Sequence, residues 1–189
     1  MSEDFHSARH WAWALMGEAL TEGSLAVDAT MGNGHDTLRM CRQVGGAGRV
    51  WAFDIQTQAL EATAKRLEEA GMRERATLIL DSHARMADYV TEPVDGVMFN
   101  LGWLPGQDKS RRTLPESTRA AIDAALTLLK PGALLTVCAY PGHEEGRAER
   151  DMLMKWASEL DPKRYDAMLR TYLNQPNDPP LLFAVRRRL

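Results

Sequence analysis

The sequence of 189 residues has few cysteines, no long apolar run and no large excess of charge of either sign. Cys41 and Cys138 are too few and too far apart for a disulfide framework, so we expect two buried, reduced thiols. No apolar run approaches the roughly 18–20 residues of a membrane span. The acidic start, Met1-Ser2-Glu3-Asp4, is unlike a signal peptide. These absences predict a cytoplasmic protein without a membrane partner.

The charge is nearly balanced, since 23 Lys and Arg against 26 Asp and Glu leave a net charge of −3. This balance excludes a broadly basic surface that binds nucleic acid non-specifically, but it allows a local basic patch. No repeat or linker divides the chain, and a domain of this length needs no disulfide or metal for stability. We expect one domain over residues 1–189, with an N-terminal helix in 1–24, a core in 25–189 and no metal site.

Short apolar runs alternate along the chain with longer amphipathic stretches. Apolar residues three or four positions apart predict a first helix over His6–Leu20. Strands are predicted at 25–29, 49–54, 76–80, 94–100, 133–140, 165–173 and 181–187, and further helices at 35–44, 57–70, 82–90, 115–129 and 144–160. Lys130-Pro131-Gly132 predicts a helix end followed by a turn.

This alternation predicts an α/β, Rossmann-like fold built from right-handed βαβ units. The sheet is expected to have seven strands, mostly parallel, with helices on both faces. Only Asn174–Pro180 separates the last two predicted strands, which is too short for a crossover helix. The last strand is therefore expected to be antiparallel.

A glycine turn follows the first predicted strand. The strand ends at Ala29, Gly32 and Gly34 form the turn, and a helix begins near His35. Glycine in this place lets a ligand approach the backbone closely. Asp54, at the end of the second strand, is placed to accept hydrogen bonds from ribose hydroxyls.

Two ligand classes share this pattern. A dinucleotide site has a third glycine, where this chain has Thr37. S-adenosylmethionine has no phosphate but carries an ammonium group, which suits Asp28 at the end of the first strand. We favour S-adenosylmethionine as the cofactor. One alternative is a dinucleotide cofactor. The other is that the glycines only turn the chain and bind no ligand.

The predicted cofactor site also includes residues after the second and third strands. Gln56 follows Asp54, and Ser82 and His83 follow the third strand. A solvated Gln56 and a structural His83 are the alternative interpretations. The full predicted set is Asp28, Thr30, Gly32, Asn33, Gly34, Asp54, Gln56, Ser82 and His83.

The fourth strand ends in Asn100-Leu101-Gly102-Trp103-Leu104-Pro105-Gly106. This segment is similar in form to the Asn/Asp-Pro-Pro-aromatic motif of methyltransferases that act on amino nitrogens, with Leu101-Gly102 in place of the prolines. An Asn oxygen can accept an N–H and so orient the lone pair of an amine, and an aromatic ring can stack on a base. We predict catalytic roles for Asn100 and Trp103. The alternative is a turn-forming Asn100 and a core Trp103.

Five segments together resemble a bacterial family of rRNA methylase-like proteins within the class I S-adenosylmethionine-dependent methyltransferases. They are 28–37, 53–56, 99–106, 140–143 and 174–180. The resemblance extends from about residue 10 to the end of the chain. Trp103 stands where the family usually has Tyr, and Gln107 where it usually has Gly.

The resemblance implies a tRNA-modifying methyltransferase that takes S-adenosyl-L-methionine as cofactor. Its members convert the 5-aminomethyl group of 5-aminomethyl-(2-thio)uridine at wobble position 34 to 5-methylaminomethyl. The implied partner is the anticodon stem-loop of tRNA, and a homodimer is left open. The alternatives are N-methylation of rRNA or another amine, or a catalytically silent cofactor-binding module.

Charged residues after the fourth and fifth strands are candidates for substrate binding. An alkylammonium group must lose a proton before it can be methylated, and Asp108, His143 or water are candidates to receive it. Lys109, Arg111 and Arg112 follow the fourth-strand loop, where they could contact RNA phosphates. Each of them could equally be an ordinary solvated charge.

Overall fold

The computed structural model describes residues 7–102 and 115–189. Its strands are β1 (Leu25–Asp28), β2 (Arg49–Asp54), β3 (Ala76–Leu80), β4 (Val94–Asn100), β5 (Leu129–Ala139), β6 (Tyr165–Arg170) and β7 (Leu181–Arg187). Its helices are α1 (Ala8–Ala19), α2 (His35–Val44), α3 (Thr57–Glu69), α4 (Pro115–Leu128) and α5 (Glu144–Ser158), with short 3-10 helices η1 (Arg73–Arg75) and η2 (His83–Asp88).

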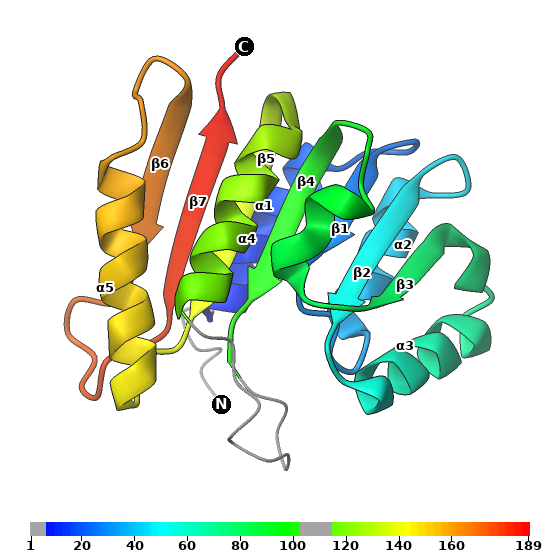
Figure 1. Cartoon of the computed structure of the whole chain (residues 1–189), viewed down its shortest axis with the longest axis horizontal. Helices are drawn as coiled ribbons and strands as arrows, with labels where there is room; N and C mark the ends of the chain where they lie inside the picture. The colour runs from blue at the N-terminus through cyan, green and yellow to red at the C-terminus, as the bar shows by residue number, and fades with distance from the viewer. Residues whose placement is uncertain (1–6, 103–114) are drawn as a thin grey trace.

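The strands form one sheet in the order β3-β2-β1-β4-β5-β7-β6 (Figure 1). Strands β1 to β5 pair in parallel, and β7 lies antiparallel between β5 and β6. The predicted seven-stranded, mostly parallel sheet with an antiparallel last strand is thus confirmed. The strand order reverses between β1 and β4, which is the place where open α/β sheets bind ligands.

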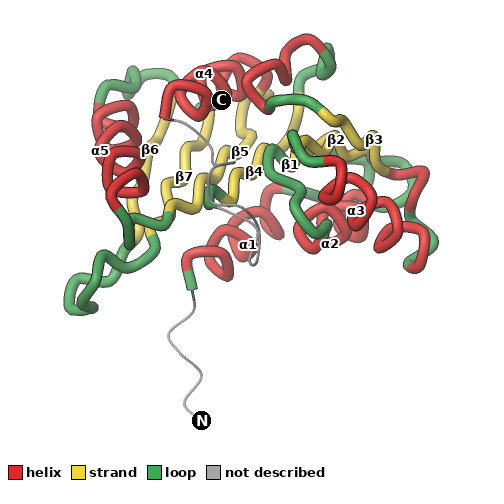
Figure 2. The backbone as a smooth tube through the Cα atoms, turned by 60° about the horizontal axis from the view of Figure 1, so that its bottom comes forward, coloured by secondary structure: helices red, strands yellow, loops and turns green. Residues whose placement is uncertain are grey.

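Helices cover both faces of the sheet (Figures 1 and 2). Because successive side chains of a strand point to opposite faces, Val97 and Phe99 belong to one core layer and Met98 to the other. The first layer packs against α4, α5 and η2, and the second against α1, α2 and α3. Both cysteines, Cys41 and Cys138, are buried as free thiols in the second layer.

Helix α1 precedes the βα units and packs on β4, β5 and β7. It begins at the cap residue Ser7, whose hydroxyl accepts the backbone N–H of His10 at 3.2 Å. Met16 of α1 and Leu20, the residue that follows the helix, are buried against Gly96 of β4, where an added Cβ would meet their side chains within about 3 Å. Among the helices of the described ranges, none is long and apolar enough to cross a membrane.

The structure differs from the predicted elements mainly at the start of β5. We predicted a turn at Lys130-Pro131-Gly132, but β5 already begins at Leu129. The pairing with β4 shifts from Val94–Leu129 to Gly96–Leu134, which leaves a bulge. Proline cannot donate to the ladder and Gly132 has φ +83°, so both residues fit a bulge inside a strand.

Two other predicted elements are shorter or different in type. The predicted helix 82–90 is the 3-10 helix η2, which is interrupted at Arg85 (φ −99°, ψ 15°). The predicted strand 165–173 ends at Arg170 because β7, its only partner in the described residues, pairs no further.

A buried carboxyl group joins α4 and α5. Glu149 of α5 is 7% exposed and accepts a hydrogen bond of 3.0 Å from the hydroxyl of Thr118 in α4. Burial raises the pKa of Glu149 to about 7, although the bond from Thr118 opposes this shift. The folded protein therefore keeps a proton on Glu149 at pH values where the unfolded chain has lost it.

This raised pKa predicts a pH-dependent stability difference for Glu149→Gln, which keeps an acceptor for Thr118 but cannot ionise. Between about pH 4.5 and 7 the folded wild type binds more protons at this site than the unfolded chain, so its free energy of unfolding falls as pH rises. As pH rises through this range, the free energy of unfolding of the variant should increase relative to that of the wild type by about 1–3 kcal/mol. Urea unfolding at several pH values measures it, with exposed Glu69→Gln as control. Parallel profiles for wild type and Glu149→Gln would contradict the prediction.

Candidate active site

A cavity of about 600 Å³ opens at the carboxyl ends of β1 to β4, where the strand order reverses. Its volume lies within the ~300–1,000 Å³ of typical ligand sites. Residues after all four strands contribute to its wall, together with Arg9 of α1, His35 and Asp36 of α2, and Tyr140 after β5. Side chains that are far apart in the sequence therefore meet around one space.

The glycine turn lies between β1 and α2 and is fixed from two sides. Gly34, the residue before α2, has φ +75°, and an added Cβ would lie 2.8 Å from the Cα of Thr63 in α3. The backbone N–H of Gly32 donates to Asp54 Oδ2 at 3.1 Å, and the Thr63 hydroxyl donates to the Gly32 carbonyl at 3.1 Å. The turn thus needs glycine at position 34 so that α3 can approach the loop closely.

Asp54 at the end of β2 presents a fixed carboxylate to the cavity. Its Oδ1 accepts from the backbone N–H of Gln56 at 3.0 Å and its Oδ2 from Gly32 at 3.1 Å. Burial raises the pKa of Asp54, and the backbone donors oppose that shift. Each oxygen retains acceptor capacity, so Asp54 can accept hydrogen bonds from two neighbouring hydroxyls.

Asp28 at the end of β1 lies behind the cavity wall. It is 1% exposed and accepts from the Thr37 hydroxyl at 2.6 Å and from the backbone N–H of Thr30 at 3.1 Å. Burial, with the nearby charge of Asp36, raises the pKa of Asp28 to about 7. The residue holds the turn together here, and its contact with a ligand ammonium stays a prediction.

Buried acceptor atoms lie at the β2 and β3 side of the cavity. His83 is 8% exposed, and its Nδ1 lies 3.0 Å from the carbonyl of Ala29, which assigns the ring hydrogen to Nδ1. Burial lowers the pKa of His83, so the ring is neutral and its Nε2 is an acceptor. Within the described residues, His83 Nε2 and Gln56 Oε1 are buried without a hydrogen-bond partner. They could accept hydrogen bonds from a ligand amino group.

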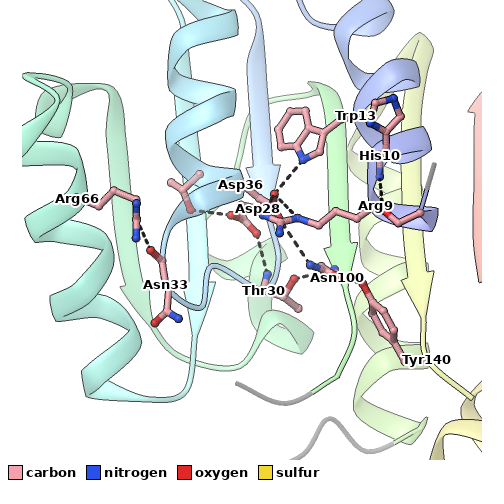
Figure 3. Close-up of polar contacts among 12 residues, drawn as sticks. Arg9, His10, Trp13, Asp28, Thr30, Asn33, Asp36, Arg66, Asn100 and Tyr140 are labelled. Atoms are coloured by element: carbon pink, nitrogen blue, oxygen red, sulfur yellow. Dashed lines mark hydrogen bonds and ion pairs between the residues drawn. The ribbon is translucent and has the colours of Figure 1, made fainter. Parts of the chain in front are cut away.

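A polar cluster occupies the other side of the cavity, around Asp36 in the first turn of α2 (Figure 3). Asp36 Oδ1 accepts from Arg9 Nε at 2.9 Å, Arg9 Nη2 at 2.6 Å and Trp13 Nε1 at 2.9 Å. Arg9 and Trp13 lie four residues apart and therefore on one face of α1. The Asp36 side chain is 8% exposed and that of Arg9 42%.

Asn100 at the end of β4 has its side-chain amide oriented by this cluster. Its Nδ2 lies 3.4 Å from Asp36 Oδ2, and its Oδ1 accepts the Tyr140 hydroxyl at 2.7 Å. Its backbone N–H donates to the Thr30 hydroxyl at 2.8 Å. Burial raises the pKa of Tyr140 to about 12, so the phenol keeps its proton and donates. The carbonyl oxygen of Asn100 has a second lone pair for another donor.

Seven of the predicted site residues line the cavity. Of the others, some lie elsewhere in the fold and some lie outside the described residues. The lining includes Thr30, Asn33, Asp54, Gln56, Ser82, His83 and Asn100. Gly32, Gly34 and Asp28 form and support the turn behind them. His143 instead precedes α5 and accepts the backbone N–H of Gly146 at 3.0 Å. Trp103, Asp108, Lys109, Arg111 and Arg112 lie outside the described residues.

Sequence reasoning gave no role to Arg9, Asp36 or Tyr140, which all line the cavity. Asp36 and Tyr140 stand within segments that carry the family resemblance, which was the available signal. Arg9 lies 27 residues from Asp36 along the chain, and no local pattern indicates that contact.

Known proteins resemble this chain in sequence and in fold. The model of the family described as "Putative rRNA methylase" matches residues 50–186. A chloroplastic Arabidopsis thaliana protein named tRNA (mnm(5)s(2)U34)-methyltransferase is 37% identical over 94% of this chain and 68% of its own length. A "putative rRNA-methylase" from Clostridium thermocellum has a TM-score of 0.95 at 37% identity, covering 97% of this chain and 98% of that one.

A "putative methyltransferase" from Streptococcus mutans, solved in complex with SAH, has a TM-score of 0.88 at 35% identity, covering 97% of this chain and 99% of that one. The fold and the site thus define a Rossmann-like methyltransferase. Within that class, the chain belongs to the rRNA methylase family that the matching model describes.

The close approach of α3 to the glycine turn predicts that Gly34→Ala destabilises the protein. The new Cβ would meet the Thr63 backbone and would have to adopt φ +75°. We expect a loss of about 1–3 kcal/mol, which lowers Tm by roughly 3–10 °C. Gly46→Ala is the matched control, since no atom lies within 4 Å of its added Cβ. Equal Tm values for the two variants would contradict this account of the turn.

Proposed function

We propose that the protein transfers a methyl group from S-adenosyl-L-methionine to the amine of 5-aminomethyl-(2-thio)uridine at the wobble position of tRNA, giving 5-methylaminomethyl-(2-thio)uridine. The observation that carries this proposal is one cavity with a ribose-type acceptor, Asp54, and an oriented amide, Asn100. The relatives support it, since one is named for this modification of tRNA and one was solved with SAH.

The residues of the cavity fit this cofactor. Asp54 has acceptor capacity for two ribose hydroxyls, and His83 Nε2 and Gln56 Oε1 are buried acceptors suited to an adenine amino group. The carboxylates of Asp54 and Asp81 line the cavity, which favours a cation over a pyrophosphate. When bound, the cofactor supplies an electrophilic methyl group on a sulfonium centre.

The residues of this chain would contribute positioning to the transfer. Asn100 Oδ1, held by the Tyr140 hydroxyl, accepts one N–H of the target amine and so directs its lone pair. His143 caps α5 through its ring nitrogen, which gives it no observed place beside the amine. Asp108 and the proposed RNA contacts Lys109, Arg111 and Arg112 follow β4 in the sequence, outside the described residues.

An amine on rRNA is the second candidate substrate, because the matching family is described by rRNA methylation. The cavity itself does not separate it from tRNA, since both would present an amine on a nucleobase. Transfer to the two RNAs therefore has to be measured side by side.

The cofactor assignment predicts the effect of Asp54→Ala on binding. Removing an acceptor of two charge-assisted hydrogen bonds should weaken S-adenosylhomocysteine by about tenfold or more in calorimetry. Asp88→Asn, at a side chain that is 58% exposed, should bind as the wild type does. Wild-type affinity in Asp54→Ala, or tighter binding of NAD than of S-adenosylhomocysteine, would refute the assignment.

The transfer itself predicts labelled 5-methylaminomethyl nucleosides. Purified protein and methyl-labelled cofactor are incubated in parallel with tRNA that carries 5-aminomethyl uridine and with rRNA, and the nucleosides of both RNAs are analysed by mass spectrometry. Asn100→Ala should lower the rate about 100-fold or more, since misplaced reactants lose that much, with cofactor affinity unchanged. Label in rRNA but not in tRNA would favour the second candidate, and label in neither would refute the proposed function.

A further inference from the structure

The two oxygens of Asp36 have unequal surroundings. Oδ1 accepts three hydrogen bonds, two from Arg9 and one from Trp13. In the described part of the chain, the one contact of Oδ2 is Asn100 Nδ2 at 3.4 Å, which is long for a hydrogen bond. A carboxylate has about four acceptor positions, so the described residues leave acceptor capacity on Oδ2 of a side chain that lines the cavity.

Asp36 Oδ2 and Asn100 Oδ1 belong to neighbouring side chains in the cavity wall. Oδ2 lies 3.4 Å from the amide nitrogen of Asn100, and the nitrogen and oxygen of an amide are ~2.3 Å apart. The two oxygens are therefore separated by at most about 5.7 Å, from the sum of these lengths. The two N–H bonds of an amine lie ~109° apart, so a nitrogen that donates two straight hydrogen bonds of ~2.9 Å joins atoms ~4.7 Å apart, a span that falls within this upper limit.

The first helix holds this arrangement in place. Arg9 and Trp13 occupy the acceptor positions of Asp36 Oδ1. This fixes the orientation of the Asp36 carboxylate, with Oδ2 toward Asn100 (Figure 3). Tyr140 fixes the orientation of the Asn100 amide. Its hydroxyl donates to Asn100 Oδ1 and leaves that oxygen one lone pair for another donor. Side chains from α1, α2, β4 and the end of β5 thus form a rigid pair of acceptors.

We propose that Asp36 Oδ2 and Asn100 Oδ1 together bind the target amine, and that Arg9 and Trp13 are positioning residues for Asp36. This inference rests on the proposed function and adds Asp36 to it. The carboxylate recognises the ammonium form, which releases one proton to solvent. The remaining two N–H groups donate to the two oxygens, so the lone pair points away from them. A new N–C bond then forms as the bond from methyl to sulfur breaks, and the methylated nitrogen takes up the positive charge.

Binding of two RNAs tests this inference. Anticodon stem-loops with 5-aminomethyl uridine or with unmodified uridine are titrated by fluorescence anisotropy, with S-adenosylhomocysteine present. The wild type should prefer the aminomethyl RNA by about tenfold or more, because a charge-assisted hydrogen bond contributes that much. Asp36→Asn should lose this preference while keeping its affinity for unmodified RNA and for S-adenosylhomocysteine. Asp88→Asn should keep the preference.

The positioning residues have their own readout. Trp13→Phe keeps the packing of the ring but removes one donor to Oδ1, and should raise KM for aminomethyl tRNA several-fold at an unchanged cofactor affinity. Arg9→Lys should restore part of the preference that Arg9→Ala loses, since an ammonium can still pair with Asp36. Unchanged KM in Trp13→Phe, or equal loss in both Arg9 variants, would contradict the positioning role.

The outcomes separate this inference from the proposed function. Labelled tRNA from the wild type, with an undiminished amine preference in Asp36→Asn, would overturn the inference and leave the proposed function standing. A weakened affinity of Asp36→Asn for S-adenosylhomocysteine, with the preference retained, would assign Asp36 to the cofactor and also overturn it. Absence of label from all RNAs in the wild type would refute the proposed function itself.

Discussion

The ion pair between Arg9 and Asp36 joins parts of the chain that no βα unit brings together. Asp36 Oδ1 accepts from α1 and Oδ2 contacts the end of β4, so one carboxylate connects the first helix, the glycine turn and Asn100. The Asp36 side chain is 8% exposed and that of Arg9 42%, so the carboxylate is shielded from water while its guanidinium partner reaches the surface. The position of α1 at the cavity and the orientation of the Asn100 amide therefore depend on this pair.

The sheet topology explains why a helix outside the βα units takes part in the site. β1 pairs with both β2 and β4, so the chain leaves the sheet in opposite directions after β1 and after β4. The resulting crevice has the glycine turn and Asp54 on one side and Asn100 on the other. α1 packs on β4, β5 and β7. This packing places Arg9 in the wall of the crevice, on the side that the glycine turn does not cover.

Local patterns in the sequence predicted the strands and part of the cavity lining, because both depend on residues close together in the chain. The turn before α2 and Asp54 after β2 are examples. Contacts across long separations were missed: Arg9 meets Asp36 27 residues away, and Tyr140 meets Asn100 40 residues away. The bulge in β5 was missed for another reason, since proline and glycine are typical of turns and of bulges alike.

The charges of the cavity constrain how the proposed RNA substrate would bind. The carboxylates of Asp36, Asp54 and Asp81 line the cavity, and they suit sulfonium and ammonium groups but repel phosphate. The RNA backbone must then stay outside, and only the modified base can enter. Arg9 lines the cavity but is paired with Asp36, so under the proposed function the basic residues that contact RNA phosphates are expected outside the cavity. Under the proposed function, the cavity recognises the amine of the modified base, and a small group of basic residues outside the cavity binds the phosphates of the stem-loop.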